Sequence, residues 1–365
     1  MRFKIPFSPT LLIAGLLTTV TSFAAGGNWT LVWADEFDVD GPPNPANWDY
    51  DLGGGGWGNS EIQTYTDSLD NARVEDGRLI IEVRQNRETA RNAYTSARLV
   101  TRGLHAWQYG RIEFRARLPK TTGTWSAVWM LSENAIFDGA FWPDNGEIDL
   151  MEHVGYEEDP LFHAVHGSVP NNIHGTLHTK MRNHLTSTGL GGSTLVENAT
   201  EEFNTYAIVW LEDRIEFEVN GVVYNTIHKA QQIPVRNPPD DISPYWPFDQ
   251  PFHLIVNVAV GGDWGGHFNS GFYPDDSPYG PLGIDHDGEW PQRMEIEYIR
   301  VYAPSENAES WLGFPVQRGY ADTGDWLGPV NISNAPWLYS ADWGWFNAPE
   351  EAQNETGGWI WLPAP

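Results

Sequence analysis

The chain has 365 residues, with 49 Asp and Glu against 21 Lys and Arg, a formal net charge of −28 and no cysteine. This charge repels nucleic acids, anionic lipids and polyanionic substrates, so none of them is expected as a partner. The missing cysteines exclude disulfides and thiolate metal sites. The 19 tryptophans suit stacking on uncharged sugars as well as a place in the core.

The N-terminus has the pattern of a signal peptide over residues 1–24. A basic start at 1–4 precedes an apolar run from about Leu11 to Val20, and Ser22-Phe23-Ala24 fits a small-x-small cleavage signal. The apolar run is too short to cross a bilayer, and no later segment replaces it. A buried N-terminal strand is the alternative. We therefore expect an exported monomer without a membrane span, which starts near Ala25 and is secreted or stays in a bacterial periplasm or cell envelope.

Strand signals dominate the rest of the chain. Alternation of polar and apolar residues indicates strands at 78–83, 110–118 and 293–301. Residues 206–227 have the pattern of three strands joined by turns, and Asn220-Gly221 predicts a type I′ hairpin there. Residues 252–260 form a more continuous apolar strand. Because no stretch keeps a helical period over three turns, we expect an all-β sandwich.

The composition changes after Tyr302. Residues 304–365 are rich in tryptophan and contain one basic residue, Arg318. We place a boundary near residues 303–306. The C-terminal extension is then either a tail that packs onto the main domain or an independent small module.

The candidate for chemistry is the acidic stretch Glu147-Ile148-Asp149-Leu150-Met151-Glu152. Alternate side chains of a strand share a face, so Glu147 and Asp149 point the same way. Strict alternation would place Met151 beside them and turn Glu152 to the opposite face. A bulge near residues 150–151 would return Glu152 to the face of the other acids.

With such a bulge, Glu147 and Glu152 would form the pair of carboxyl groups that glycosidic bond cleavage requires. One acid protonates the leaving oxygen, and a second carboxylate meets the positive charge that develops on the sugar. Mutual repulsion of the acids can keep one protonated while another is ionised. The alternative is a solvated strand face with acids by chance. The apolar Ile148, Leu150 and Met151 argue against it, since they indicate a buried strand in which unpaired acids are costly.

The acidic stretch from Glu147 to Glu152 resembles the signature of glycoside hydrolase family 16, in the bulged E-x-D-x-x-E form of its laminarinases and agarases. Lichenases of that family carry the shorter E-x-D-x-E. The resemblance runs from about Trp29 to Tyr302 and rests on several motifs in the same order, which include those at 56–65, 94–98, 107–113, 125–129, 257–266 and 291–302. It implies a concanavalin A-like β-jelly roll with an open substrate cleft, residues 25–303 as the catalytic domain, and retention of anomeric configuration.

The resemblance also implies roles for individual residues. Glu147 would be the nucleophile and Glu152 the general acid/base, with Asp149 between them to tune the nucleophile's charge. Substrate-binding residues would be Asn59, Arg98, Trp125, Trp129, Trp142, His153, His178 and Trp264. A structural calcium, with no part in catalysis, would be held by Glu36, the backbone of Gly77 and Glu297.

The function that the resemblance implies is that of a retaining endo-β-1,3-glucanase, a laminarinase. Such an enzyme cuts β-glucans such as laminarin internally by double displacement. The same fold and mechanism could act on agar, carrageenan or mixed-linkage glucan. The bulged motif argues against a lichenase, and the acidic surface argues against sulfated galactans. A non-catalytic β-glucan-binding protein is the other alternative. Such a protein would be expected to have lost catalytic glutamates, whereas this chain keeps all three acids.

Overall fold

The computed structural model describes residues 29–87, 93–134, 142–155, 171–186, 188–236, 239–266 and 284–304, together with short strands beyond residue 304. The expected signal peptide, residues 1–24, lies outside the described residues. The chain divides into one unit of Leu31–Tyr302 and a second that joins Met1–Thr30 with Ala303–Pro365. The larger unit carries the acidic motif.

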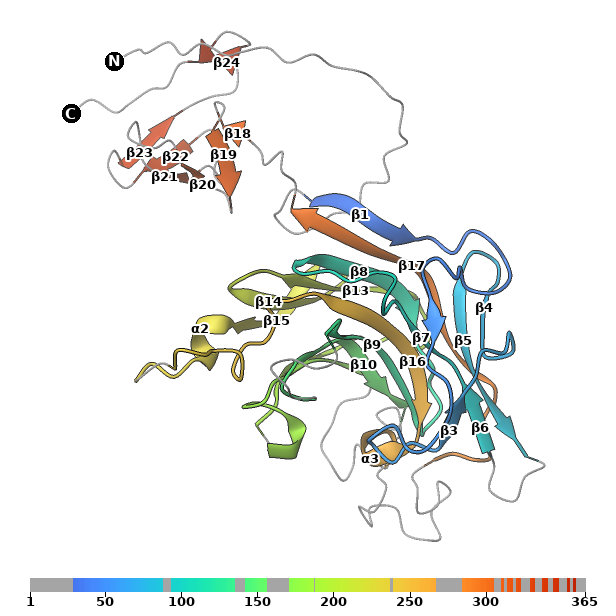
Figure 1. Ribbon diagram of the computed structural model, residues 1–365. Coiled ribbons are helices and arrows are strands. Elements are labelled where there is room, and N and C mark those ends of the chain that lie inside the picture. The colour runs from blue at the N-terminus through green and yellow to red at the C-terminus, as the bar shows by residue number, and fades with distance from the viewer. Residues whose placement is uncertain are drawn as a thin grey trace. The chain divides into compact units, whose positions relative to one another are not determined.

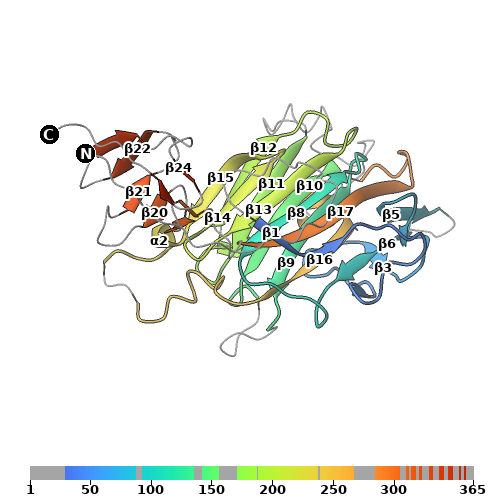
Figure 2. The same ribbon diagram turned by 90° about the horizontal axis from the view of Figure 1, so that it is seen from above.

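The acidic motif lies in a seven-stranded antiparallel sheet (Figure 1). Its strands in spatial order are β12 (Leu190–Leu195), β11 (Asn172–His178), β10 (Glu147–Val154), β9 (Thr124–Ser132), β16 (Phe252–Val260), β7 (Arg98–Val100) and β2 (Asp49–Tyr50). In the view of Figure 2, β12, β11 and β10 run side by side. Strand β10 is therefore an interior strand, paired with β9 on one side and β11 on the other.

A ten-stranded sheet forms the other layer of the sandwich, with β8 and β13 lying above β9 and β10 in Figure 1. Its main path is β15 (Val222–His228), β14 (Arg214–Val219), β13 (Asn204–Trp210), β8 (Gly110–Arg117), β17 (Gln292–Pro304), β5 (Leu79–Asn86), β6 (Ala93–Ser96) and β3 (Gln63–Tyr65). Strand β1 (Trp29–Asp35) pairs with β17, and β4 (Ala72–Val74) pairs with β5. The strands expected at 78–83, 110–118, 206–227, 252–260 and 293–301 are confirmed.

The hairpin between β14 and β15 turns at Asn220 and Gly221, as the sequence predicts. Their φ angles are 50° and 77°, so both have the left-handed conformation that a type I′ turn requires.

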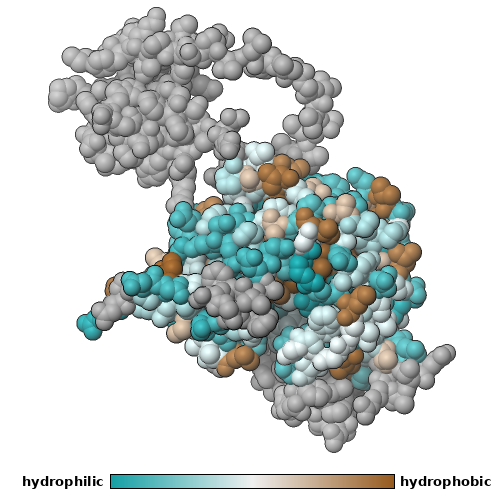
Figure 3. Space-filling model, in the orientation of Figure 1, coloured by the Kyte–Doolittle hydropathy of each residue, from teal (hydrophilic) through white to brown (hydrophobic). Residues whose placement is uncertain are grey.

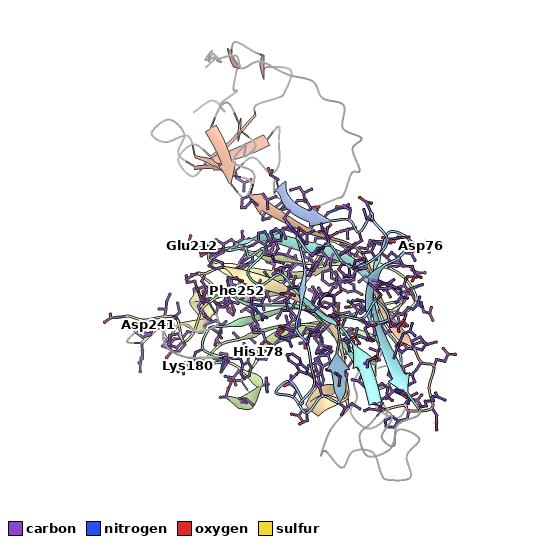
Figure 4. All side chains as sticks on the ribbon, turned by 45° about the vertical axis from the view of Figure 1, so that its right-hand side comes forward. Asp76, His178, Lys180, Glu212, Asp241 and Phe252 are labelled. Carbon is purple, nitrogen blue, oxygen red and sulfur yellow. The ribbon has the colours of Figure 1, made fainter. Side chains whose placement is uncertain are left out.

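The core lies between the two sheets and is built from the inward-facing residues of each alternating strand. Large side chains such as Phe114, Trp210, Phe217 and Phe252 are fully buried there, and Figure 4 labels Phe252 within the sandwich. Each buried side chain of this size stabilises the fold by roughly 1.5–3 kcal/mol. On the face shown in Figure 3, the described residues are mostly hydrophilic, with apolar side chains scattered among them.

The helices of the described residues are short. They are η2 (His184–Thr186), α2 (Lys229–Gln232) and α3 (Gly262–Gly265). None of the helices in the described part of the chain is long and apolar enough to span a membrane.

The smaller unit has a sheet of its own, of six antiparallel strands. They are β18 (Ser310–Trp311), β19 (Phe314–Gln317), β20 (Tyr320–Asp322), β21 (Pro329–Asn331), β22 (Trp337–Ser340) and β23 (Gly344–Asn347). Strands β24 (Gln353–Asn354) and β25 (Gly357–Gly358) form a separate pair. The tryptophan side chains of the extension are not among the described ones. Its two alternatives, a tail that packs onto the main domain and an independent small module, both stay predictions.

Candidate active site

The acidic strand contains the bulge that its spacing predicts. Toward β9, Asp149 pairs with Trp129 and Met151 with Val128, so Leu150 has no partner of its own. Toward β11, the pairing also shifts between Asp149 and Glu152. Leu150 and Met151 are both buried in the core, because the extra residue lets two successive side chains point inward.

The bulge brings all three acids to one face. Glu147, Asp149 and Glu152 pair with Leu131, Trp129 and Ala127 of β9, which are alternate residues of one strand and therefore share a face. This face points away from the core that buries Ile148 and Leu150. The predicted return of Glu152 to the side of Glu147 is confirmed.

Burial of three carboxyls together raises their pKa values. Burial has the largest effect on all three, and repulsion from neighbouring acids adds to it for Glu147 and Asp149. The pKa values of Glu147 and Asp149 lie well above the usual range. The pKa of Glu152 is raised less, because the charge of His178 and a hydrogen bond from Trp125 favour its ionised form. These upward shifts disfavour ionisation of all three acids together, and retaining hydrolysis requires one carboxylate and one carboxylic acid.

Each glutamate accepts a hydrogen bond from a tryptophan. The indole Nε1 of Trp142 donates to Oε2 of Glu147 at 2.7 Å, and Nε1 of Trp125 donates to Oε1 of Glu152 at 3.0 Å. Trp125 belongs to β9, whereas Trp142 precedes β10. Two separate elements therefore fix the orientation of the two carboxyls. This contact is additional to the sugar stacking expected of both tryptophans.

His178 lies beside the other end of the acid cluster, at the end of β11, where Figure 4 labels it. Its Nε2 is 3.2 Å from Oδ2 of Asp149 and 3.8 Å from Oε1 of Glu147. The rings of Trp142 and His184 pack around it, with centroids at 5.9 and 5.3 Å. The structure thus brings His178 to the acids, as expected for a residue of the site.

His153 does not reach this face. It pairs with Ser126 of β9, whereas Glu152 pairs with Ala127, so the two successive side chains point to opposite faces. The His153 side chain is fully buried. Its position next to Glu152 in the sequence suggested a substrate contact, but regular alternation after the bulge turns it inward. We therefore correct that expectation.

Arg98 is held between two aromatic rings. Its guanidinium lies 4.8 Å from the ring centroid of Trp57 and 4.7 Å from that of Trp129, and its Nε donates to Asp51 at 3.2 Å. Trp129 is itself fixed, because its Nε1 donates to Oδ1 of Asn257 at 2.7 Å. The guanidinium from β7 therefore packs between one ring from the loop before β3 and one ring from β9.

The loop before β3 presents Asn59 through unusual backbone conformations. Trp57 and Ser60 have φ angles of 48° and 60°, in the left-handed region that costs a non-glycine residue energy. The Asn59 side chain donates to Oε1 of Glu61 at 3.3 Å, and its backbone oxygen accepts from Asp263 at 2.7 Å. The loop is thereby tied to α3.

Trp264 lies on α3 and packs with the residues around Glu152. Its ring meets Trp125 edge-on at 5.5 Å and His174 edge-on at 5.0 Å. His174 is the β11 residue paired with Glu152. The expected residues Trp125 and Trp264 are therefore brought together, near the general acid candidate. The open cleft expected over this face stays a prediction.

The side chains expected to bind calcium contact arginines in the structure. Both carboxylate oxygens of Glu36 accept hydrogen bonds from Arg300, at 2.7 and 2.8 Å, and the Glu297 carboxylate pairs with Arg115. A calcium held by Glu36, the backbone of Gly77 and Glu297 stays a prediction, and it would have to displace these guanidinium groups.

Several residues of the site were not predicted. They are Asp51, Trp57, Glu61, His174, His184 and Asn257. A signal existed for Asn257, a polar residue in the otherwise apolar strand 252–260. The pairing of His174 with Glu152 depends on the register of two strands, and this register cannot be predicted from the sequence.

The fold and the site together define a β-sandwich glycoside hydrolase. The profile of the family described as Glycosyl hydrolases family 16 matches residues 59–271. The chain is 46% identical over 276 residues to a β-glucanase of Rhodothermus marinus, which covers 75% of this chain and 85% of that protein. The chain therefore belongs to the family 16 glycosyl hydrolases.

Two further relatives have names that specify a linkage or substrate. A glucan endo-1,3-β-glucosidase of Cryptopygus antarcticus is 33% identical over 302 residues, which cover 79% of this chain and 96% of that protein. The X-ray structure of the laminarinase from Rhodothermus marinus matches with a TM-score of 0.65 at 46% identity, and covers 77% of this chain and 99% of that chain. The expected family and fold are confirmed.

Proposed function

We propose that this chain is an endo-β-1,3-glucanase, which hydrolyses internal β-1,3-glucosidic bonds of glucans such as laminarin with retention of anomeric configuration. The observation that carries the proposal is the bulged strand β10, which places Glu147, Asp149 and Glu152 on one outward face. The relatives that bear the names β-glucanase, glucan endo-1,3-β-glucosidase and laminarinase support the substrate class.

In the first step, Glu152 gives its proton to the glycosidic oxygen as Glu147 attacks the anomeric carbon. The bond from carbon to the leaving oxygen breaks, and an ester between Glu147 and the glucosyl unit forms. Trp142 holds Oε2 of Glu147, so Oε1 is the oxygen left to attack. Burial raises the pKa of Glu152, which is the direction that a general acid needs.

In the second step, the Glu152 carboxylate takes a proton from water, and the water oxygen attacks the anomeric carbon. The ester bond breaks, Glu147 is restored as a carboxylate, and Glu152 is protonated again. Asp149 lies between the two glutamates on the strand. Its negative charge, or its proton, sets which of its neighbours is ionised, and His178 at 3.2 Å orients it.

The substrate-binding roles rest on the rings and polar groups beside the acids. Trp125, Trp129, Trp142 and Trp264 offer apolar ring surfaces, whereas Asn59 and Arg98 offer donors for sugar hydroxyls. Uncharged hydroxyl-rich chains suit this surface and the net charge of −28 better than sulfated polymers do. We further propose that the chain is exported through its signal peptide and acts as a monomer.

The test is the release of new reducing ends from laminarin, lichenan, agarose and carrageenan, with Glu147→Ala as the control for contaminating activity. We expect release from laminarin by the unmodified chain and none by the variant. Nuclear magnetic resonance of the first product should show the β-anomer before mutarotation. Release of reducing ends from a galactan alone would contradict the assignment of a β-1,3-glucan as the substrate. A first product in the α-form would contradict the retaining mechanism.

A non-catalytic glucan-binding protein is the contrasting outcome. Binding of laminarin in affinity electrophoresis without any release of reducing ends would establish it. The three acids and their two tryptophan donors argue for catalysis, because burying several carboxyls together is costly and such clusters are typical of catalytic sites.

A further inference from the structure

Two acids and one histidine of the active site converge as a set of metal ligands. Glu147, Asp149 and His178 each offer one ligand atom, and these three atoms lie within 4.8 Å of one another. The Nε2 of His178 is 3.2 Å from Oδ2 of Asp149 and 3.8 Å from Oε1 of Glu147. An imidazole with two carboxylates is a ligand set that zinc accepts.

The two distances from His178 Nε2 are close to those of tetrahedral coordination. Zinc binds nitrogen and oxygen ligands at about 2.0–2.1 Å, so neighbouring ligand atoms of a tetrahedron are about 3.3 Å apart. The two distances from His178 Nε2, 3.2 and 3.8 Å, bracket that value. A cation could therefore be bound by small side-chain adjustments on β10 and β11, with the fourth position left for water.

One ligand atom has unused bonding capacity. Asp149 is 3% exposed, yet among the described residues no hydrogen bond reaches its Oδ2. Buried polar atoms without partners are costly. A cation at this position would satisfy Oδ2 of Asp149 and neutralise part of the acid cluster.

We propose that Glu147, Asp149 and His178 form an inhibitory site for a divalent transition-metal cation of the zinc type. Binding uses an oxygen of Glu147 and neutralises its charge, so the nucleophile cannot attack a sugar. The cation and the substrate then compete for the same carboxylate. The inhibitory consequence rests on the proposed function, whereas the binding of the cation does not.

The site predicts weak and reversible binding. The Glu147 side chain is 16% exposed, so solvent reaches the site. Among the described residues, the Nδ1 of His178 has no acceptor of the kind that usually orients a metal-binding histidine, and loss of such a partner weakens affinity about 10–100-fold. The imidazole favours zinc, copper or nickel over calcium and magnesium, which prefer oxygen ligands alone.

The binding test uses no substrate. The purified chain is titrated with cobalt(II), whose visible absorption reports tetrahedral coordination, and with zinc by calorimetry in a buffer that does not bind metals. We expect a single site in the unmodified chain, lost in both His178→Ala and Asp149→Asn. Thermal melting confirms that each variant is folded. The matched control is His184→Ala, because His184 contacts His178 but is not in the ligand set.

Retention of the tetrahedral cobalt spectrum in both ligand variants would overturn the site, as would the absence of binding by the unmodified chain at millimolar zinc. The kinetic arm measures laminarin hydrolysis at several zinc concentrations. We expect the apparent KM to rise with kcat unchanged, with full recovery on addition of EDTA. Inhibition that lowers kcat alone would overturn competition at Glu147. Absence of hydrolysis without zinc would count against the proposed function and leave the binding result standing.

Discussion

Trp125 donates its indole N–H to Oε1 of Glu152 at 3.0 Å, across from β9 to the bulged strand. The hydrogen bond favours the ionised form of Glu152 and so works against the burial that raises its pKa. The indole thus affects the proton equilibrium of the catalytic acid in addition to any contact with a sugar. The ring and the N–H can be separated by substitution.

Trp125→Phe keeps an aromatic ring and removes the donor. Since the lost hydrogen bond lowered the pKa of Glu152, that pKa should rise, and the protonated acid should persist to higher pH. The basic limb of the kcat/KM profile on laminarin should therefore move upward. At the optimum, kcat/KM should fall about tenfold or more, because hydrogen bonds to charged groups contribute about 1.5–3 kcal/mol.

The control for this substitution is Trp129→Phe. Trp129 lies on the same strand, but its N–H donates to Asn257 at 2.7 Å and not to an acid. Its variant should weaken substrate binding without moving the basic limb. An equal displacement of the limb in both variants would show that the donor to Glu152 has no special role.

Asp149→Asn should raise stability at neutral pH while it lowers activity. The folded-state pKa of Asp149 is raised, first by burial and then by the Glu152 charge. A raised carboxyl pKa means that the folded state holds the proton more tightly. Stability is then lost as the pH rises from the unfolded-state value, about 3.9, through the folded-state pKa. The amide removes this loss.

The measurement is thermal unfolding of Asp149→Asn and the unmodified chain at pH 4 and pH 7. A gain of about 1 kcal/mol at pH 7 would raise Tm by about 2–4 °C in a domain of this size. The gain should shrink toward pH 4. A variant that is less stable by the same amount at both values would contradict the burial cost assigned to this acid.

Gly175→Ala should destabilise the sandwich opposite the bulge. A Cβ at Gly175 would lie 2.3 Å from Cδ1 of Phe217 and 2.5 Å from the hydroxyl of Tyr224, so the core must move. Overpacking of this kind costs about 1–3 kcal/mol. Gly189→Ala is the matched control, since nothing lies within 4 Å of its added Cβ, and it should change stability by less than about 0.5 kcal/mol. Urea unfolding of both variants tests the difference.

Arg98→Met should raise the KM for laminarin at least about tenfold, because it removes a guanidinium held between two rings and an aspartate. Arg102→Met is the control. Both arginines pair with Asp51, at 3.2 Å for Arg98 and 2.6 Å for Arg102, but their side chains are 11% and 47% exposed. The exposed pair contributes little. Equal KM values for the two variants would contradict a binding role for Arg98.

The strands, and the position of the three acids on one face, could be predicted from the sequence, because both follow from side-chain alternation. Polar and apolar residues alternate in β8, β16 is buried throughout as its continuous apolar run indicates, and the two-then-three spacing from Glu147 to Glu152 requires one extra residue. Alternation also places His153 opposite Glu152. Proximity along the chain was a poorer guide to its position than strand geometry.

The contacts between distant segments could not be predicted. The packing of Arg98 between Trp57 and Trp129 joins three segments, and the pairing of Glu36 with Arg300 joins residues 264 positions apart. Each depends on the register and twist of the sheets. The tryptophan donors are a similar case, because a composition rich in tryptophan indicates rings but not where an N–H points.

Strand β10 is hydrogen-bonded on both sides, to β9 and to β11, in the interior of its sheet. Its amide hydrogens should therefore exchange with deuterium among the slowest in the molecule, through openings that approach global unfolding. Catalytic acids on such backbone have no loop motion of their own. Heat should consequently inactivate the enzyme at the temperature at which the whole sandwich melts, with no earlier loss of activity from local opening at the acids.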